Sequence, residues 1–158
     1  DITKGCSTSP DRFCPNNLVS RAEMAAFLVR AFLRTDTFSY GLTPLFSDVP
    51  MHHALFAHVQ KAAELGIIPP CGPGRFCPND AVSRRDMAAF IVRASLPTGN
   101  PFFVSTQEPY FIDVPKWDPS YAFIQRLRDM GVTTGCSPIQ FCPNDLVTRG
   151  QTAVFLVR

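Results

Sequence analysis

The chain has 158 residues, 15 Lys and Arg against 13 Asp and Glu, and a formal net charge of +2. Its length suits one domain of ordinary size, and 46% hydrophobic residues place it outside the disordered class. No apolar stretch approaches the roughly 20 residues that a membrane helix requires, and the charge is too low for the basic surface of a nucleic-acid-binding protein. We therefore expect no direct membrane insertion and no nucleic-acid partner.

A sequence repeat organises the chain. The stretches FCPNNLVSRAEMAAFLVRA, FCPNDAVSRRDMAAFIVRA and FCPNDLVTRGQTAVFLVR begin at Phe13, Phe76 and Phe141. A second block, FSDVP or FIDVP, begins at Phe46 and Phe111 and precedes another helical pattern. Each complete repeat therefore predicts a first helix, a Cys-containing loop and a second helix.

The alignment of these blocks divides one domain into three parts. Residues 1–34 are the second half of repeat 1, residues 35–94 are repeat 2 and residues 95–158 are repeat 3. Because Asp1 aligns with the residue that follows the first helix in the later repeats, we expect the first helix of repeat 1 upstream of Asp1. The chain is then a fragment of a longer protein.

Five helices are predicted in chain order: after Ser20, from Phe56 to Gly66, after Ser83, from Asp118 to Met130 and after Thr148. The three second helices start with Ser or Thr N-caps, and Glu23, Asp86 and Gln151 follow three residues later, as in a capping box. They continue as MAAFLV, MAAFIV and TAVFLV, which are apolar on nearly all sides. This pattern predicts a central bundle of buried helices.

The first helices are amphipathic. Tyr121, Ile124 and Leu127 recur on one face of the later helix, as Phe56, Val59 and Ala62 do in repeat 2. This face should pack against the bundle, and Gly66 and Gly131 should follow the helix ends as C′ residues.

Six cysteines fall into three local pairs at the same place in each repeat: Cys6 with Cys14, Cys71 with Cys77, and Cys136 with Cys142. The pattern predicts three disulfides and therefore an oxidising, exported location. Zinc is the less favoured alternative, because each loop offers only two thiols and no His. His52, His53 and His58 lie in one region, and their spacing does not favour a metal site.

The repeat resembles the S-layer homology repeat of bacterial cell-surface proteins. The resemblance rests on FIDVP, the helix that follows it, GVTTG and FCPNDLVTRGQTAVFLVR. It extends over almost the whole chain. The resemblance implies an all-α fold in which three helix-loop-helix repeats form a pseudo-threefold, three-pronged body. It also implies anchoring to cell-wall polysaccharide, often an acidic polymer with pyruvate ketals, in grooves between the repeats.

The same resemblance points to Arg21, Arg84 and Arg149 as ligand-binding residues. Each stands in a first helical turn, where unpaired N–H groups and the helix dipole favour anions, and each guanidinium suits a carboxylate. The alternative is an internal ion pair for each Arg. The candidate partners include Asp48 and Asp113 of the DVP motifs and Asp80 and Asp145 of the Cys-Pro-Asn loops. Asp48 and Asp113 are also candidate ligand-binding residues.

Trp117 is a further candidate, either stacking on a sugar ring or packing half-buried beside a helix start. Arg85, next to Arg84, either strengthens an anion site or is a solvated surface residue.

No nucleophile elbow, phosphate-binding loop or repeated acid–base site is present, so the sequence predicts a non-catalytic module with no cofactor and no metal. The leading hypothesis is an anchor on the bacterial cell surface that binds an anionic cell-wall polysaccharide, such as a pyruvylated one. The alternative is a structural subunit of an S-layer, sheath or filament that packs on other surface-protein subunits through exposed aromatic residues such as Phe102, Phe103 and Tyr110.

Overall fold

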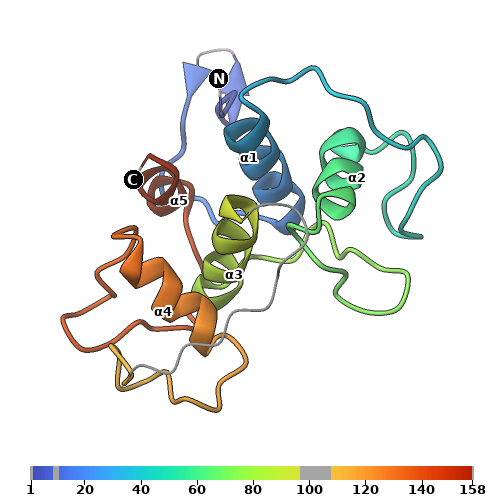
Figure 1. Ribbon diagram of the computed structural model, residues 1–158. Coiled ribbons are helices and arrows are strands. Elements are labelled where there is room, and N and C mark those ends of the chain that lie inside the picture. The colour runs from blue at the N-terminus through green and yellow to red at the C-terminus, as the bar shows by residue number, and fades with distance from the viewer. Residues whose placement is uncertain (1, 9–10, 97–107, 158) are drawn as a thin grey trace.

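The computed structural model describes residues 2–8, 11–96 and 108–157. Within them the chain forms a hairpin of two-residue strands and five helices (Figure 1), so the all-α prediction is confirmed. Phe102 and Phe103 lie outside the described residues. The strands are β1 (Ser7–Thr8) and β2 (Asp11–Arg12), and the helices are α1 (Arg21–Leu33), α2 (Phe56–Glu64), α3 (Arg84–Ser95), α4 (Tyr121–Asp129) and α5 (Arg149–Leu156).

The second helices begin where the caps predict. Ser20, Ser83 and Thr148 each accept a hydrogen bond from the backbone N–H three residues later. At Ser20 and Thr148 the reciprocal half of the capping box is also formed. The shorter side chain of Asp86 instead accepts the hydroxyl of Ser83, at 2.7 Å.

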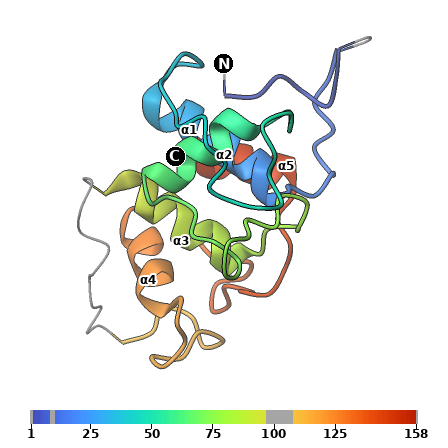
Figure 2. The same ribbon diagram turned by 90° about the vertical axis from the view of Figure 1, so that its right-hand side faces the viewer.

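The amphipathic first helices pack as predicted. Helix α2 lies against α1 and helix α4 lies against α3, and both views of the molecule show these pairs (Figures 1 and 2). Tyr121, Ile124 and Leu127 are buried in the second pair. Helix α4 starts later than expected, because the carboxylate of Asp118 accepts the N–H and the hydroxyl of Ser120 and holds a turn before the helix.

The three second helices are buried to different extents. Helices α1 and α3 are buried almost all round, as predicted, but α5 buries only Arg149 and Thr152. Among the described residues no helix covers the outer face of α5 (Figure 1), so Val154 and Val157 remain exposed. The expectation of three equally buried helices is therefore wrong for α5.

Backbone hydrogen bonds close a ring through the segments that precede these helices. The N–H of Val19 donates to Val147 O at 3.0 Å, the N–H of Val147 to Val82 O at 2.9 Å, and the N–H of Val82 to Val19 O at 2.9 Å. These three valines occupy the same position in each repeat and are all buried. The ring brings together parts of the chain that lie far apart in sequence.

The three predicted disulfides are present: Cys6–Cys14, Cys71–Cys77 and Cys136–Cys142. The second cysteine of each pair has a left-handed backbone, with φ between 53° and 57°. Each disulfide therefore closes a tight loop that leads into the ring.

Two buried glutamines hold the connectors that enter repeats 2 and 3. Gln60 accepts the N–H of Leu45 and donates to the carbonyls of Gly41 and Thr43. Gln125, its equivalent in α4, accepts the N–H of Tyr110 and donates to Glu108 O. The polar groups of these loops are thereby satisfied at the protein interior.

Candidate functional site

The three candidate arginines occupy equivalent positions in the repeated sequence. Each begins a second helix and donates its Nε–H to a Phe carbonyl in the Cys loop of the next repeat. The distances are 2.8 Å from Arg21 to Phe76 O, 2.7 Å from Arg84 to Phe141 O and 2.9 Å from Arg149 to Phe13 O. Each guanidinium thus joins the start of one repeat's helix to the loop of its neighbour.

Aromatic rings enclose each guanidinium. Its central carbon lies between 4.8 and 5.7 Å from the centroids of two Phe rings, one from the Cys loop and one from the second helix of the next repeat. Such cation–π contacts strengthen when water is excluded. Burial lowers the pKa of Arg21 and of Arg84, although nearby carboxylates oppose the shift.

The sequence analysis did not anticipate these partners. One signal was available: Phe27, Phe90 and Phe155 recur at the same position of the three second helices, as Phe13, Phe76 and Phe141 do in the loops. The predicted ion pairs with Asp48, Asp113, Asp80 or Asp145 are not formed, because in the described part of the chain no carboxylate oxygen lies within 4.0 Å of Arg21 or Arg84. Arg149 pairs instead with Glu23, at 3.5 Å.

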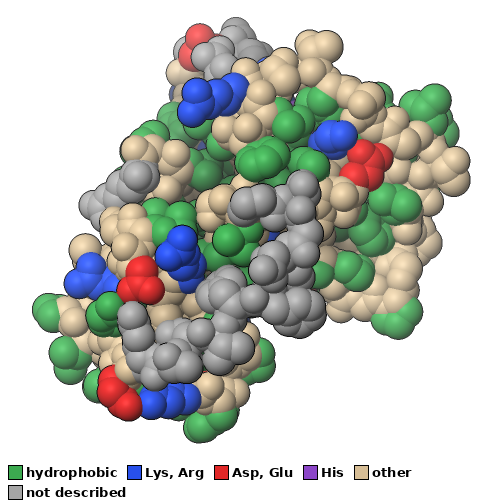
Figure 3. Space-filling model, in the orientation of Figure 1, with side chains coloured by type: hydrophobic (Ala, Val, Ile, Leu, Met, Phe, Trp, Pro, Cys, Tyr) green, Lys and Arg blue, Asp and Glu red, His purple; other side chains and the backbone are tan. Residues whose placement is uncertain are grey.

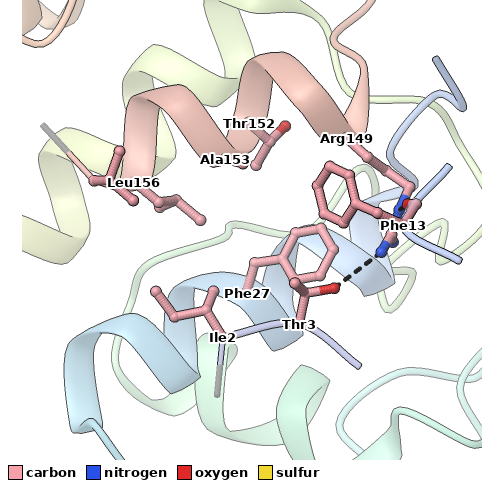
Figure 4. A pocket seen from close by; sticks show the side chains of 9 residues that line it. Ile2, Thr3, Phe13, Phe27, Arg149, Thr152, Ala153 and Leu156 are labelled. Atoms are coloured by element: carbon pink, nitrogen blue, oxygen red, sulfur yellow. Dashed lines mark hydrogen bonds between the residues drawn. The ribbon is translucent and has the colours of Figure 1, made fainter. Parts of the chain in front are cut away.

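Each arginine lines a cavity at a junction between repeats. The Arg21 groove has a volume of about 460 Å³, the Arg84 groove about 400 Å³ and the Arg149 pocket about 150 Å³. The Arg149 pocket is almost wholly apolar, with Phe13 and Phe27 beside the arginine and Leu156 farther along α5 (Figure 4). The surroundings differ, since the Arg21 and Arg84 grooves have polar as well as apolar walls.

The other charged candidates have structural partners. Asp48 accepts the N–H groups of Phe76 and Cys77, both at 2.8 Å, and Asp113 accepts those of Phe141 and Cys142 at the same distance. Burial alone would raise the pKa of Asp48, but these hydrogen bonds outweigh it and hold the pKa below its usual value. Neither carboxylate lines the Arg21 groove, the Arg84 groove or the Arg149 pocket, and each braces a Cys loop.

Trp117 is 82% exposed, so the alternative that it packs half-buried is wrong. It is not among the groove-lining residues, although Pro119 and Ser120 beside it are. Arg85 lines the Arg21 groove and lies 3.5 Å from Asp118.

Asp48, Cys71 and Cys77 bring one oxygen and two sulfurs within 4.8 Å of one another. Both sulfurs belong to a disulfide and the carboxylate accepts two backbone N–H groups, so these atoms already have other bonding partners.

The described helices include none that is both long and apolar enough to span a membrane. On the face shown in Figure 3, charged side chains are scattered among hydrophobic and uncharged ones.

Comparison with known families identifies the repeat. The model of the S-layer homology domain matches residues 45–88 and 110–153, more than half of the chain. The chain belongs to the S-layer homology domain family. Domains of this family are non-catalytic modules that anchor proteins at the cell surface, so the predicted extracellular location at the bacterial surface is confirmed.

Two longer proteins are similar to this chain. A cell surface protein of Thermoanaerobacter kivui is 24% identical over 160 residues, which cover 100% of this chain and 18% of that protein. An endoglucanase of Bacillus sp. strain KSM-635 is 28% identical over 135 residues, or 85% of this chain and 14% of that enzyme. The chain thus spans less than a fifth of either relative's length.

Proposed function

We propose that this S-layer homology module binds an anionic cell-wall polysaccharide and so attaches a larger protein to the bacterial envelope. The carrying observation is that an arginine at the start of a second helix lines a cavity in all three repeats. This arginine is buried at Arg84 and Arg149 and half-buried at Arg21. The first two N–H groups of each of these helices already donate to loop carbonyls, so the expected unpaired N–H groups are not there. The guanidinium and the positive end of the helix dipole are what favour a carboxylate, such as that of a pyruvate ketal. The relatives' surface location supports the same role.

The proposal includes an arrangement of repeats. We assign residues 1–34, 35–94 and 95–158 to three repeats related by a pseudo-threefold axis, each prong being built from the second helix of one repeat and the first helix of the next. The cyclic hydrogen bonds of Val19, Val82 and Val147 and the α1–α2 and α3–α4 pairs support this arrangement.

Sedimentation with purified cell walls tests the proposal. We expect the chain to pellet with intact walls and to stay in the supernatant when the secondary polysaccharide has been stripped from the same walls. A disulfide-reduced, unfolded sample is the control for non-specific adsorption. Equal pelleting on intact and stripped walls would overturn the polysaccharide model.

Alanine substitution of all three arginines is a poor test. Each side chain donates to a backbone carbonyl across the repeats, so its loss leaves buried acceptors unpaired and destabilises the fold. Loss of binding would then report unfolding.

A structural subunit is the second candidate. Ile112 and Ile139 are exposed and adjacent, since the N–H of Ile112 donates to Ile139 O at 3.0 Å, and exposed Tyr110 and Trp117 lie in the same connector region. Such side chains suit a protein partner. Concentration-dependent association in analytical ultracentrifugation that Ile112→Ser abolishes would favour this candidate.

A further inference from the structure

The three arginines differ at the outer guanidinium nitrogen. Arg21 Nη2 donates to Pro69 O at 2.6 Å, and Arg149 Nη2 donates to Thr3 Oγ1 at 2.9 Å, as the dashed line in Figure 4 shows. Arg84 Nη2 is buried and has no hydrogen-bond partner in the described part of the chain. The whole Arg84 residue is only 6% exposed, yet it lines the Arg84 groove.

The loop of repeat 3 explains why this donor is unpaired. Thr134 stands where repeat 2 has Pro69, and Gly135 stands where it has Pro70. Gly135 has φ 93°, and a Cβ there would lie 2.4 Å from Gln140 O. Proline holds φ near −65°, so the two loops take different paths, and no carbonyl equivalent to Pro69 O reaches Arg84.

A neutral side chain also replaces an acid in this groove. The third residue of the neighbouring second helix is Glu23 beside Arg149, with the carboxylate 3.5 Å from the guanidinium. At Arg21 the equivalent residue is Asp86, which makes the largest Coulombic contribution in favour of the charged guanidinium. At Arg84 it is Gln151, which lines the Arg84 groove.

Arg84 is thus a buried cation that lacks the outer hydrogen bond of both counterparts and the close Glu23 carboxylate of Arg149. As at Arg21, the carboxylates that favour its charge lie more than 4.0 Å away, Asp145 being the first of them. Asp145 is the acid in the Arg84 groove, and its oxygens lie more than 4.0 Å from the guanidinium. Burying a charged N–H donor without an acceptor costs free energy, and a bound oxyanion from outside the chain would lower that cost by accepting the hydrogen bond.

We propose that the Arg84 groove is the one of the three that accepts the carboxylate of the polysaccharide, with Arg84 Nη2 donating to an oxygen, while Arg21 and Arg149 serve as internal braces. This inference rests on the proposed function. It predicts one high-affinity site per chain and assigns Gln151 the role of keeping that site free of a competing anion.

A pair of single-atom substitutions tests the inference. Gln151→Glu introduces the competing carboxylate, and Glu23→Gln removes one from the neighbour of Arg149. Both Glu and Gln already form the capping box in this chain, so both variants should fold, and Gln151→Glu should melt at an equal or higher temperature. The probe is soluble polysaccharide released from walls with which the wild type sediments, and calorimetry measures affinity and stoichiometry.

We expect Gln151→Glu to weaken binding at least tenfold and Glu23→Gln to leave the dissociation constant within twofold. Carboxyl-reduced polysaccharide should not bind. Unchanged binding by Gln151→Glu, equal losses in both variants, three sites per chain or full binding of reduced polymer would each overturn the inference while wild-type wall binding stands. Failure of the wild type to bind intact walls would instead remove the proposed function.

Discussion

A buried guanidinium is stable where its donors find acceptors and its flat faces find aromatic rings. The Nε donors of Arg21, Arg84 and Arg149 meet this requirement through Phe carbonyls and paired Phe rings, which the ion-pair alternative did not foresee, whereas Arg84 Nη2 has no acceptor among the described residues. The carboxylates of Asp48 and Asp113 do not pair with these arginines but accept backbone N–H groups of the Cys loops. Each arginine therefore has two structural roles, since it bonds to the neighbouring Cys loop and also lines a cavity.

The Asp48 carboxylate offers a test at this scale. Asp48→Asn leaves one of two backbone N–H groups facing an amide donor, so we expect it to lower the free energy of unfolding by about 1–3 kcal/mol at pH 7. The folded pKa of Asp48 is below the ordinary 3.8, so the carboxylate's contribution is complete above that pH and is lost as the pH falls through the folded value. Denaturant unfolding at several pH values measures both effects.

The difference between wild type and Asp48→Asn should therefore shrink below about pH 4. Asp11→Asn, at an exposed position of β2, is the matched control and should change stability little at any pH. A constant difference down to pH 2 would contradict this role for Asp48.

Among the helices, α5 is the case in which an apolar sequence pattern did not predict burial. The motif TAVFLV is apolar like its counterparts except for Thr152, but within the described residues no first helix packs on α5 as α2 and α4 pack on α1 and α3, and Val154 and Val157 stay exposed. A helix's own residues determine that it forms and how it is capped. Which of its faces is covered depends on the helix packed against it.

An added helix tests this explanation of α5. A copy of residues 111–130 fused before Asp1 should cover the apolar face of α5, as α4 covers α3. Burial of one or two side chains of valine size, less the cost of ordering the helix, should stabilise the domain by about 1–3 kcal/mol, or roughly 2–10 °C in melting temperature. Calorimetry and loss of ANS binding measure the effect.

The control extension carries Ser at the positions copied from Tyr121, Ile124 and Leu127. It should leave the melting temperature unchanged. An equal rise with both extensions would show that the apolar face of α5 is not the docking surface.

For the whole molecule, stability depends on contacts that close a ring. The Nε of Arg149 reaches Phe13 O across 136 residues of sequence, and Arg84 reaches Phe141 O across 57. The disulfides act locally, with separations of six to eight residues, and stiffen the loops that carry these acceptors.

Removal of one disulfide tests that contribution. Cys71→Ser with Cys77→Ser should lower the free energy of unfolding by about 2–3 kcal/mol, the chain-entropy value for a loop this short. Residue 77 has a left-handed backbone, which costs Ser about as much conformational free energy as it costs Cys. The loss of stability therefore measures the contribution of the cross-link. Denaturant unfolding with and without reductant measures it, and a loss below about 1 kcal/mol would contradict the account.

The sequence alone determined the repeat, the starts of the three second helices, the disulfide pairs and the family, because each depends on residues within a few positions of one another or on motifs in a fixed order. Caps at Ser20, Ser83 and Thr148 and loops between neighbouring cysteines are of this kind. Only the tertiary structure decided which acceptors the arginines use, which helix face is open and why the Arg84 groove differs. Those features arise from contacts between repeats, where a change such as Pro69 to Thr134 alters a hydrogen bond to a residue about fifty positions away.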